Sequence, residues 1–352
     1  MLDVSLNIGS QLSWRGWKSI VVTRSLEQIA GTFELSLTDR WSETSEAAYF
    51  RPGQSCQVLA DGGSRIRGFV DDLDVNVSDQ QHEIAVNGRD RTADLVDCSV
   101  DDEPGEWSGV TVGKIIQDIC SPLGIEVVDA AADTSSIAKF RVEQGETAFT
   151  TIERAARLHG LIVRSDEVGR VVIERLTVNG GNRHDIALVY GENIEQASAR
   201  FSMRERFSAY SVKGHGFGSD EGLTSEINEP VGAASDPNVG RYRPLTVLAE
   251  DQGGASVFEE RAQWEASVRA ARAKRAEVTV TGWLDGMGRT WQPGWLVDCS
   301  IPSLNIEGNM RIASARFSID DRAGAVTSLS LASPGSFVPA PAVADEEEDW
   351  GW

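Results

Sequence analysis

The chain has 352 residues, of which 54 are acidic and 33 basic, giving a formal charge of −21. Such an acidic balance argues against a surface that grips nucleic acid backbones. Hydrophobic content of 41% and charged content of 25% are ordinary for a globular fold in water. The length favours two or three domains, and the sequence shows neither a leader segment nor an apolar run near the roughly 20 residues that cross a bilayer. We therefore expect no membrane anchor and folding in a cytoplasm.

The first hundred residues follow the two-residue period of β-strands. Residues 32–38 alternate apolar and polar side chains, and residues 69–77 and 83–88 alternate on either side of a polar turn. This pattern predicts antiparallel strands with one buried face. We expect a small antiparallel β-barrel over residues 1–97.

The middle of the chain changes to a helical period. Residues 111–120 place their apolar side chains on one stripe, and residues 145–160 repeat this pattern and end on a glycine. A hairpin is expected next, over residues 161–173. Together these elements predict an α/β domain over residues 98–180.

The last third returns to alternation at residues 313–331, which predicts a second barrel over residues 181–337. Residues 181–250 belong either to this barrel alone or to the middle domain as well. Ser256 and Glu259 have the spacing of a capping box and predict a third helix. The long polar stretch at residues 214–240 is expected to be a mobile loop. Three basic residues are expected in the last turn of that helix, namely Arg272, Lys274 and Arg275.

A Pro-Gly pair opens a strand in each of the two expected barrels. Pro52 and Gly53 precede one apolar run, and Pro293 and Gly294 precede another. Proline followed by glycine suits a type II turn, so the likeness has two explanations, shared turn chemistry or a duplicated module. A duplication predicts that the two glycines occupy equivalent turns in superimposable barrels.

Residues with the chemistry of an active site are scattered. The sequence contains neither a nucleophile elbow nor a phosphate-binding loop, and its histidines have no second ligand at metal-binding spacing. We expect no enzyme activity, no metal and no cofactor. The four histidines are His82, His159, His184 and His215, with His159 expected on a helix flank. The four cysteines, expected to be buried free thiols, are Cys56, Cys98, Cys120 and Cys299.

The C-terminal residues 338–352 form an acidic tail that ends in Trp350 and Trp352. Five consecutive carboxylates at residues 345–349 keep such a segment solvated. Two indoles are costly to leave in water and are common anchors at interfaces. The tail is therefore either a solvated extension or a docking segment whose two tryptophans bind a partner.

Seven blocks of the sequence follow one another in an order that suggests a known family. They are residues 24–38, 52–54, 68–71, 88–99, 145–160, 241–245 and 282–294. Taken in order, these blocks resemble the baseplate hub proteins of Mu-like contractile-tailed phages. The resemblance extends over nearly the whole chain and ends near Phe337.

The resemblance implies a fold class and a set of partners. The fold would be α+β and mainly β, with two tail-tube-like antiparallel β-barrel modules around an intervening α/β domain. Three subunits would form a homotrimer with six tube-like barrels, joining a trimeric central spike to the hexameric tail tube and contacting other baseplate proteins. DNA would pass through the channel without specific binding. Such a protein belongs to the virion and is assembled in the cytoplasm of the bacterial host.

Two other classes remain open from the sequence. The spike hub of a type VI secretion system has a similar architecture but normally continues into a β-helical needle. A tail-tip peptidoglycan hydrolase is the enzymatic alternative, and zymography on a cell-wall gel would separate it from a structural hub.

Overall fold

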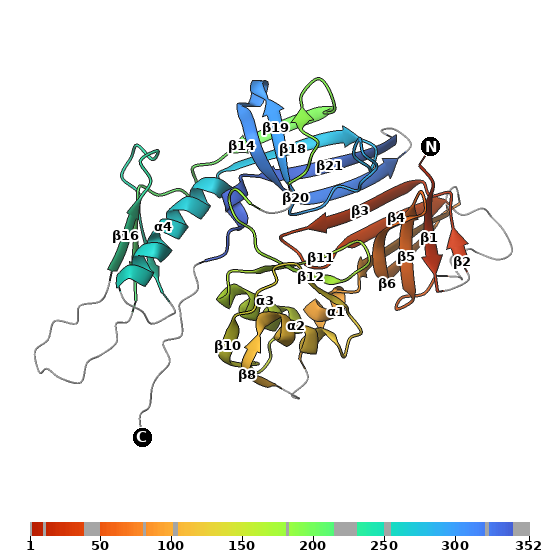
Figure 1. Ribbon diagram of the computed structural model, residues 1–352. Coiled ribbons are helices and arrows are strands. Elements are labelled where there is room, and N and C mark those ends of the chain that lie inside the picture. The colour runs from red at the N-terminus through yellow and green to blue at the C-terminus, as the bar shows by residue number, and fades with distance from the viewer. Residues whose placement is uncertain are drawn as a thin grey trace, which may run out of the picture.

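The computed structural model describes residues 2–9, 12–38, 50–79, 82–100, 105–180, 183–214, 231–249, 255–320 and 324–340. The fold is α+β and mainly β, as predicted. One long sheet crosses the molecule, an α/β unit lies beneath it, and a long helix with a small sheet extends to one side (Figure 1).

The N-terminal part of the long sheet, here called the first β module, is antiparallel, with strand order β3-β4-β7-β6-β5-β1-β2. The strands predicted from alternation at residues 32–38, 69–77 and 83–88 are all present. A short helix, α1 (Ala93–Asp97), follows the module. The strands of the first β module are β1 (Val4–Ile8), β2 (Leu12–Trp14), β3 (Ser19–Ser25), β4 (Thr32–Thr38), β5 (Ser55–Ala60), β6 (Gly63–Val77) and β7 (His82–Asp90).

The C-terminal part of the same sheet, here called the second β module, has the order β14-β18-β21-β20-β19. A two-residue strand, β13 (Leu188–Val189), pairs in parallel with β19. The other strands are β14 (Gln196–Phe201), β18 (Lys274–Thr281), β19 (Leu296–Ile301), β20 (Ile306–Asp320) and β21 (Gly324–Ala332).

The expectation of two closed barrels is wrong for the described residues. The two modules form one open sheet because β20 pairs with β3, and this sheet runs from β14 to β2 without closing. One hydrophobic core serves both modules, including Phe33 from the first and Phe317 from the second. Alternation fixes which face of a strand is buried but not which neighbour takes its edge. The predicted domain boundaries after residues 97, 180 and 337 stay predictions.

The middle of the chain forms the predicted α/β unit, with a core of its own. The Thr111 and Thr147 hydroxyls cap its two main helices by accepting hydrogen bonds from backbone N–H groups in the first turn. The predicted hairpin is β11–β12. The elements are β8 (Glu106–Thr111), α2 (Val112–Cys120), β9 (Val127–Asp129), β10 (Ser136–Arg141), α3 (Ala148–Leu158), β11 (Ile162–Ser165) and β12 (Val171–Glu174).

The third helix, α4 (Ala255–Arg272), packs against a small sheet of order β16-β15-β17. The sheet consists of β15 (Ala209–Lys213), β16 (Val231–Ser235) and β17 (Pro244–Leu248). A short helix, η3 (Pro334–Phe337), lies against α4.

Four local predictions need correction. Ser256 lies inside the first turn of α4 and does not precede it, so it cannot be the capping residue. Lys274 and Arg275 begin β18, because the chain turns from helix to strand directly after Arg272. Part of the expected loop, Val231–Ser235, is strand β16. Cys98 is exposed, whereas Cys56, Cys120 and Cys299 are buried.

Candidate functional site

The two β modules repeat the same backbone geometry around their Pro-Gly turns. In the first, the Gly53 N–H donates to the Val70 carbonyl over 2.7 Å, and the Val70 N–H donates to the Gln54 carbonyl over 3.0 Å. In the second, the Gly294 N–H donates to the Ile312 carbonyl over 2.8 Å, and the Ile312 N–H donates to Trp295 over 2.9 Å. Val70 and Ile312 therefore hold matching positions on β6 and β20.

The glycines themselves share one further property. Gly53 has φ +83° and Gly294 has φ +95°, a region that glycine enters without the steric penalty of a Cβ atom. Directly after Val70 the pairing of β6 with β7 shifts by one residue, and directly after Ile312 the pairing of β20 with β21 shifts in the same way. Turn and bulge thus recur together in both modules.

The register of the other strands agrees with this match. Phe33 on β4 pairs with Gly88 on β7, and Gly88 pairs with Val70. Ala276 on β18 pairs with Leu331 on β21, and Leu331 pairs with Ile312. In the first module the large residue of the pair lies on β4 and the small one on β7. In the second module the sizes are exchanged, with the small residue on β18 and the large one on β21. The Phe33 ring occupies the space that a side chain at Gly88 would need, since a Cβ atom on Gly88 would lie 2.4 Å from Phe33 Cζ.

The modules are joined along strands β3 and β20. Residues Ser314 to Ile319 pair in antiparallel register with Ser25 to Ile20, which places Phe317 opposite Val22. Phe317 is 1% exposed and Val22 is fully buried. The two modules are therefore joined within the chain by a strand pairing, and one face of this pairing is buried.

A buried arginine ties the α/β unit to this joint. Arg24 on β3 is 2% exposed and donates from Nη2 to the Gln292 side-chain oxygen over 2.7 Å and to the Ser165 carbonyl over 3.3 Å. Glu167 lies 3.5 Å from its Nη1. Burial lowers the pKa of the Arg24 guanidinium, and the Glu167 carboxylate opposes this shift.

Asp90, at the end of β7, is a buried carboxylate that contacts Ser165, the same residue that Arg24 contacts. Its carboxylate accepts hydrogen bonds from the Gly31 N–H, from both the N–H and the hydroxyl of Thr92, and from the Ser165 hydroxyl. Burial raises the pKa of Asp90, and these hydrogen bonds act in the opposite direction. The network joins β7 to the β11–β12 hairpin.

A second buried arginine holds the hairpin side of the α/β unit to the second module. Arg311 on β20 is completely buried and donates to the carbonyls of Gly294, Thr177 and Gly180 at 2.6, 2.7 and 3.2 Å. Burial lowers the pKa of Arg311. Beside it, Arg164 and Glu174 form a buried ion pair. No local signal in the sequence marks these contacts, because most partners lie more than a hundred residues from each arginine.

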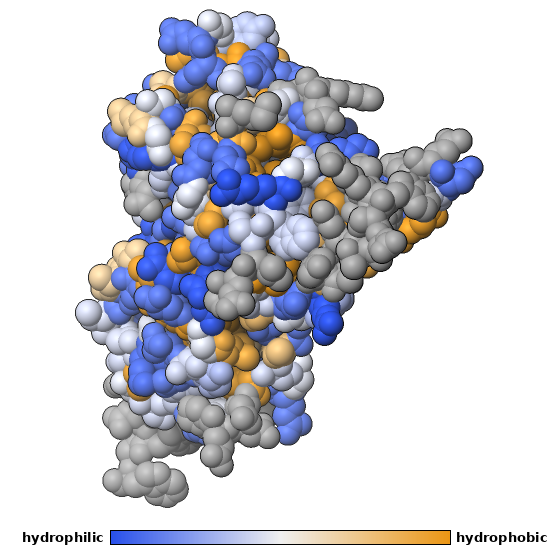
Figure 2. Space-filling model, turned by 90° about the vertical axis from the view of Figure 1, so that its right-hand side faces the viewer, coloured by the Kyte–Doolittle hydropathy of each residue, from blue (hydrophilic) through white to orange (hydrophobic). Residues whose placement is uncertain are grey.

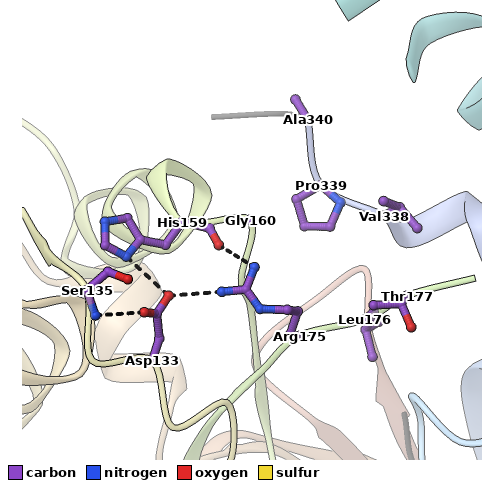
Figure 3. A pocket seen from close by; sticks show the side chains of 10 residues that line it. All are labelled: Asp133, Ser135, His159, Gly160, Arg175, Leu176, Thr177, Val338, Pro339 and Ala340. Carbon is purple, nitrogen blue, oxygen red and sulfur yellow. Dashed lines mark hydrogen bonds and ion pairs between the residues drawn. The ribbon is translucent and has the colours of Figure 1, made fainter. Parts of the chain in front are cut away.

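A shallow hollow of about 500 Å³ lies between the α/β unit and the last described residues of the chain (Figure 3). Asp133 lies on one wall of the hollow, 3.2 Å from His159 Nδ1 and 2.9 Å from Arg175 Nη2. Burial opposes ionisation of Asp133, but hydrogen bonds from Ser135 and His159 outweigh it and hold the pKa below its usual value. His159 is the residue that caps the end of α3, close to its expected place.

The last described residues of the chain line the same hollow. Pro339 and Ala340 pass over Arg175 in Figure 3, and the Trp264 indole N–H of α4 donates to the Val338 carbonyl over 2.9 Å. Trp350 and Trp352 lie outside the described residues. Among the described residues, the hollow is lined by the ion-pair cluster of Asp133, His159 and Arg175.

A second hollow, close to β14, is lined mainly by arginines, which is unusual in so acidic a chain. Two of them, Arg206 and Arg269, are paired with Asp236 and Glu265. Arg200 on β14 lies directly opposite Arg275 on β18, and like charges in such a position are unfavourable. The arginines are Arg200, Arg204, Arg206, Arg269, Arg272 and Arg275.

Within the described ranges, no three metal-ligating side chains come together, and no helix is long and apolar enough to cross a membrane. His184 is buried 2.8 Å from Asp285 under two tryptophan rings, as part of the second module. His215 lies outside the described residues.

Comparison with known proteins gives the class first. The chain superimposes on the 43 kDa tail protein of prophage MuSo2 from Shewanella oneidensis with a TM-score of 0.84 and 33% identity, covering 96% of this chain and 99% of that one. It also superimposes on the tail protein of Neisseria meningitidis MC58 with a TM-score of 0.79 and 22% identity, covering 96% and 98%. The fold is that of a phage tail protein.

The family follows from the sequence. Residues 3–90 match the N-terminal domain of Mu phage baseplate assembly protein GpP-like proteins, residues 92–175 the second domain of gp44-like baseplate hub proteins, and residues 255–340 the GpP fourth domain. The baseplate hub protein gp44 of Escherichia phage Mu is 30% identical over 331 residues, 92% of this chain and 86% of gp44. The chain belongs to the family of Mu-type baseplate hub proteins.

Proposed function

We propose that this hub protein is a symmetry adapter, a homotrimeric ring that joins a trimeric central spike to a hexameric tail tube and encloses part of the DNA channel. The observation that carries the proposal is the repeat within one subunit. β3-β4-β7-β6-β5 and β14-β18-β21-β20-β19 share strand order, pairing register, bulge and turn. Three subunits would therefore present six similar modules, which a threefold ring needs to match a sixfold tube.

The charge of the chain supports a passage for DNA. A net charge of −21 disfavours adhesion to phosphates, so a wall that shares this balance lets DNA pass without specific binding. Repulsion between acidic subunits opposes assembly, and packing at the interfaces must offset it.

The tail is proposed to serve partner docking. Residues 338–340 line the hollow beside Asp133, and the acidic run and the two tryptophans follow them in the sequence. Spike or other baseplate proteins could take Trp350 and Trp352 as anchors. A virion location with assembly in the host cytoplasm is part of the same proposal.

The mass of the purified protein in solution tests the ring. Light scattering or sedimentation should give three times the 38.1 kDa of one chain. A stable dimer, or a hexamer within assembled tails, would contradict the adapter. Zymography on a cell-wall gel tests the non-enzymatic role, since clearing is expected only from a peptidoglycan hydrolase.

A further inference from the structure

The chain contains two Asn-Gly pairs, and the structure places them in contrasting surroundings. Asn87-Gly88 lies on β7, whereas Asn179-Gly180 lies in the connection that leaves β12 toward the second β module. In such a pair the backbone nitrogen of the glycine can attack the side-chain carbonyl carbon of the asparagine, because glycine has no Cβ atom to hinder the approach and is conformationally permissive. Which pair reacts depends on how freely the main chain can rotate there.

Strand pairing holds the first pair rigidly. β7 pairs with β4 on one side and with β6 on the other over both residues. The Asn87 amide nitrogen donates to an Asp74 carboxylate oxygen over 3.4 Å, and a Cβ atom on Gly88 would lie 2.2 Å from the Phe69 carbonyl oxygen. Attack needs the main chain to rotate until the side-chain carbon and the backbone nitrogen meet. The neighbouring strands must first separate, so reaction at Asn87 requires local unfolding.

The second pair lies outside every described strand. Asn179 is exposed in a bend of the chain, and among the described residues no hydrogen bond holds its side chain or the Gly180 N–H. Hydrophilic residues cover much of the face shown in Figure 2, so exposure alone does not single out one asparagine. The combination of exposure, a following glycine and an unbonded glycine nitrogen does.

We propose that Asn179 is a site of spontaneous deamidation, a modification that needs no enzyme and no reagent besides water. The Gly180 backbone nitrogen forms a bond with Cγ of Asn179 and closes a five-membered succinimide ring. The side-chain nitrogen leaves as ammonia, taking the proton of the Gly180 N–H. Water then opens the ring at the side-chain carbonyl to give aspartate, or at the main-chain carbonyl to give isoaspartate. Either product carries one more negative charge than asparagine.

The modified residue lies where Arg311 holds this connection. Arg311 Nη2 donates to the carbonyls of Thr177 and Gly180, one before and one after Asn179, over 2.7 and 3.2 Å. Isoaspartate lengthens the main chain between these two carbonyls by one atom and so changes the spacing of the two acceptors. Its formation should therefore weaken the contact between the α/β unit and the second module. Proteins of an assembled virion are not resynthesised, so the product would accumulate as a particle ages.

Ageing of the full-length protein tests the proposal. The protein is incubated at pH 8 and 37 °C, digested and mapped by mass spectrometry. The peptide with Asn179 should gain one mass unit and separate into aspartate and isoaspartate forms, while the peptide with Asn87 should react more than about tenfold more slowly. In urea the two sites should react at similar rates, because β7 is no longer paired. An unchanged Asn179 in native protein after the unfolded protein has reacted, or equal native rates at the two sites, would overturn the inference.

The variant Asn179→Gln separates the modification from its consequence. It keeps a side-chain amide but would have to close a larger ring, so the mass gain in this peptide should disappear. A gain that persists would place the reaction at another residue and contradict the proposal. Aged wild-type protein should unfold at a lower urea concentration than fresh protein, whereas Asn179→Gln aged for the same time should lose less. Equal losses in both proteins would refute the effect on the contacts of Arg311.

Discussion

Exchange of the Phe33 and Gly88 side-chain sizes is the sharpest test of the match between the two modules. Phe33 is 1% exposed, so Phe33→Ala should lower the free energy of unfolding by about 3–5 kcal/mol through the cavity it leaves. Gly88→Leu should also destabilise the protein, since its Cβ would lie 2.4 Å from Phe33 Cζ and 2.2 Å from the Phe69 carbonyl oxygen.

The double variant Phe33→Ala/Gly88→Leu reproduces the pair found in the second module, Ala276 and Leu331. It should be more stable than the sum of the single changes predicts, with a coupling of about 0.5–3 kcal/mol. Rescue should be partial, because the Phe69 carbonyl stays in place. Urea unfolding of all four proteins measures the cycle, provided that the slopes agree.

A control separates this coupling from a general tolerance of the core. Phe317→Ala with Gly88→Leu combines a similar cavity with the same added side chain, but Phe317 lies in the other module and pairs with Thr327 and Val22. Its effects should add within about 0.5 kcal/mol. Additive behaviour of the Phe33 pair as well would refute the reasoning that the two modules solve the same packing problem with exchanged sizes.

Three further results are expected. Arg311→Met should lower stability by about 3 kcal/mol in thermal or urea unfolding, because three carbonyls, one of them in a buried hydrogen bond, lose their donor and relief of a buried cation offsets only part of the loss. An unchanged midpoint would contradict a role of Arg311 in holding the α/β unit to the second module. One thiol, Cys98, should react with a thiol reagent at pH 8 in the native protein, and four should react after unfolding. The reason is that burial raises the pKa of the other three thiols to about 12 each. Prompt labelling of more than one thiol in the native protein would contradict their burial. Removal of residues 341–352 should leave the unfolding curve unchanged and weaken incorporation into tails, and replacement of Trp350 and Trp352 by alanine should reproduce most of that loss, whereas normal incorporation would make the tail a solvated extension.

Periodicity predicted the elements of this fold better than their partners. The helices α2 and α3 and the β11–β12 hairpin follow from the apolar stripes and from the threonines and glycines at their ends. Strand β16 was missed because Val231–Ser235 contains only small side chains and alternates weakly. Local sequence carries a strong signal for which face is buried and a weak one for small-residue strands.

The joint between the modules was beyond the reach of the sequence. β3 and β20 lie far apart in the sequence, and neither strand carries a local signal that predicts which strand it pairs with. The arginines Arg24 and Arg311 resemble surface residues in the sequence, since a buried guanidinium is recognised only when its distant acceptors are known. The Pro-Gly pairs were a usable signal, because a turn that needs positive φ restricts the residue type.

The pairing of β3 with β20 also has a consequence for how the protein is made. A ribosome synthesises β3 long before β20, so all of the intervening chain must be made before β3 receives its second neighbour beside β4. Until then β3 is an unprotected edge able to pair with nascent chains nearby, and pairing between such distant segments is slow. During synthesis this edge is therefore the point at which aggregation competes with productive folding.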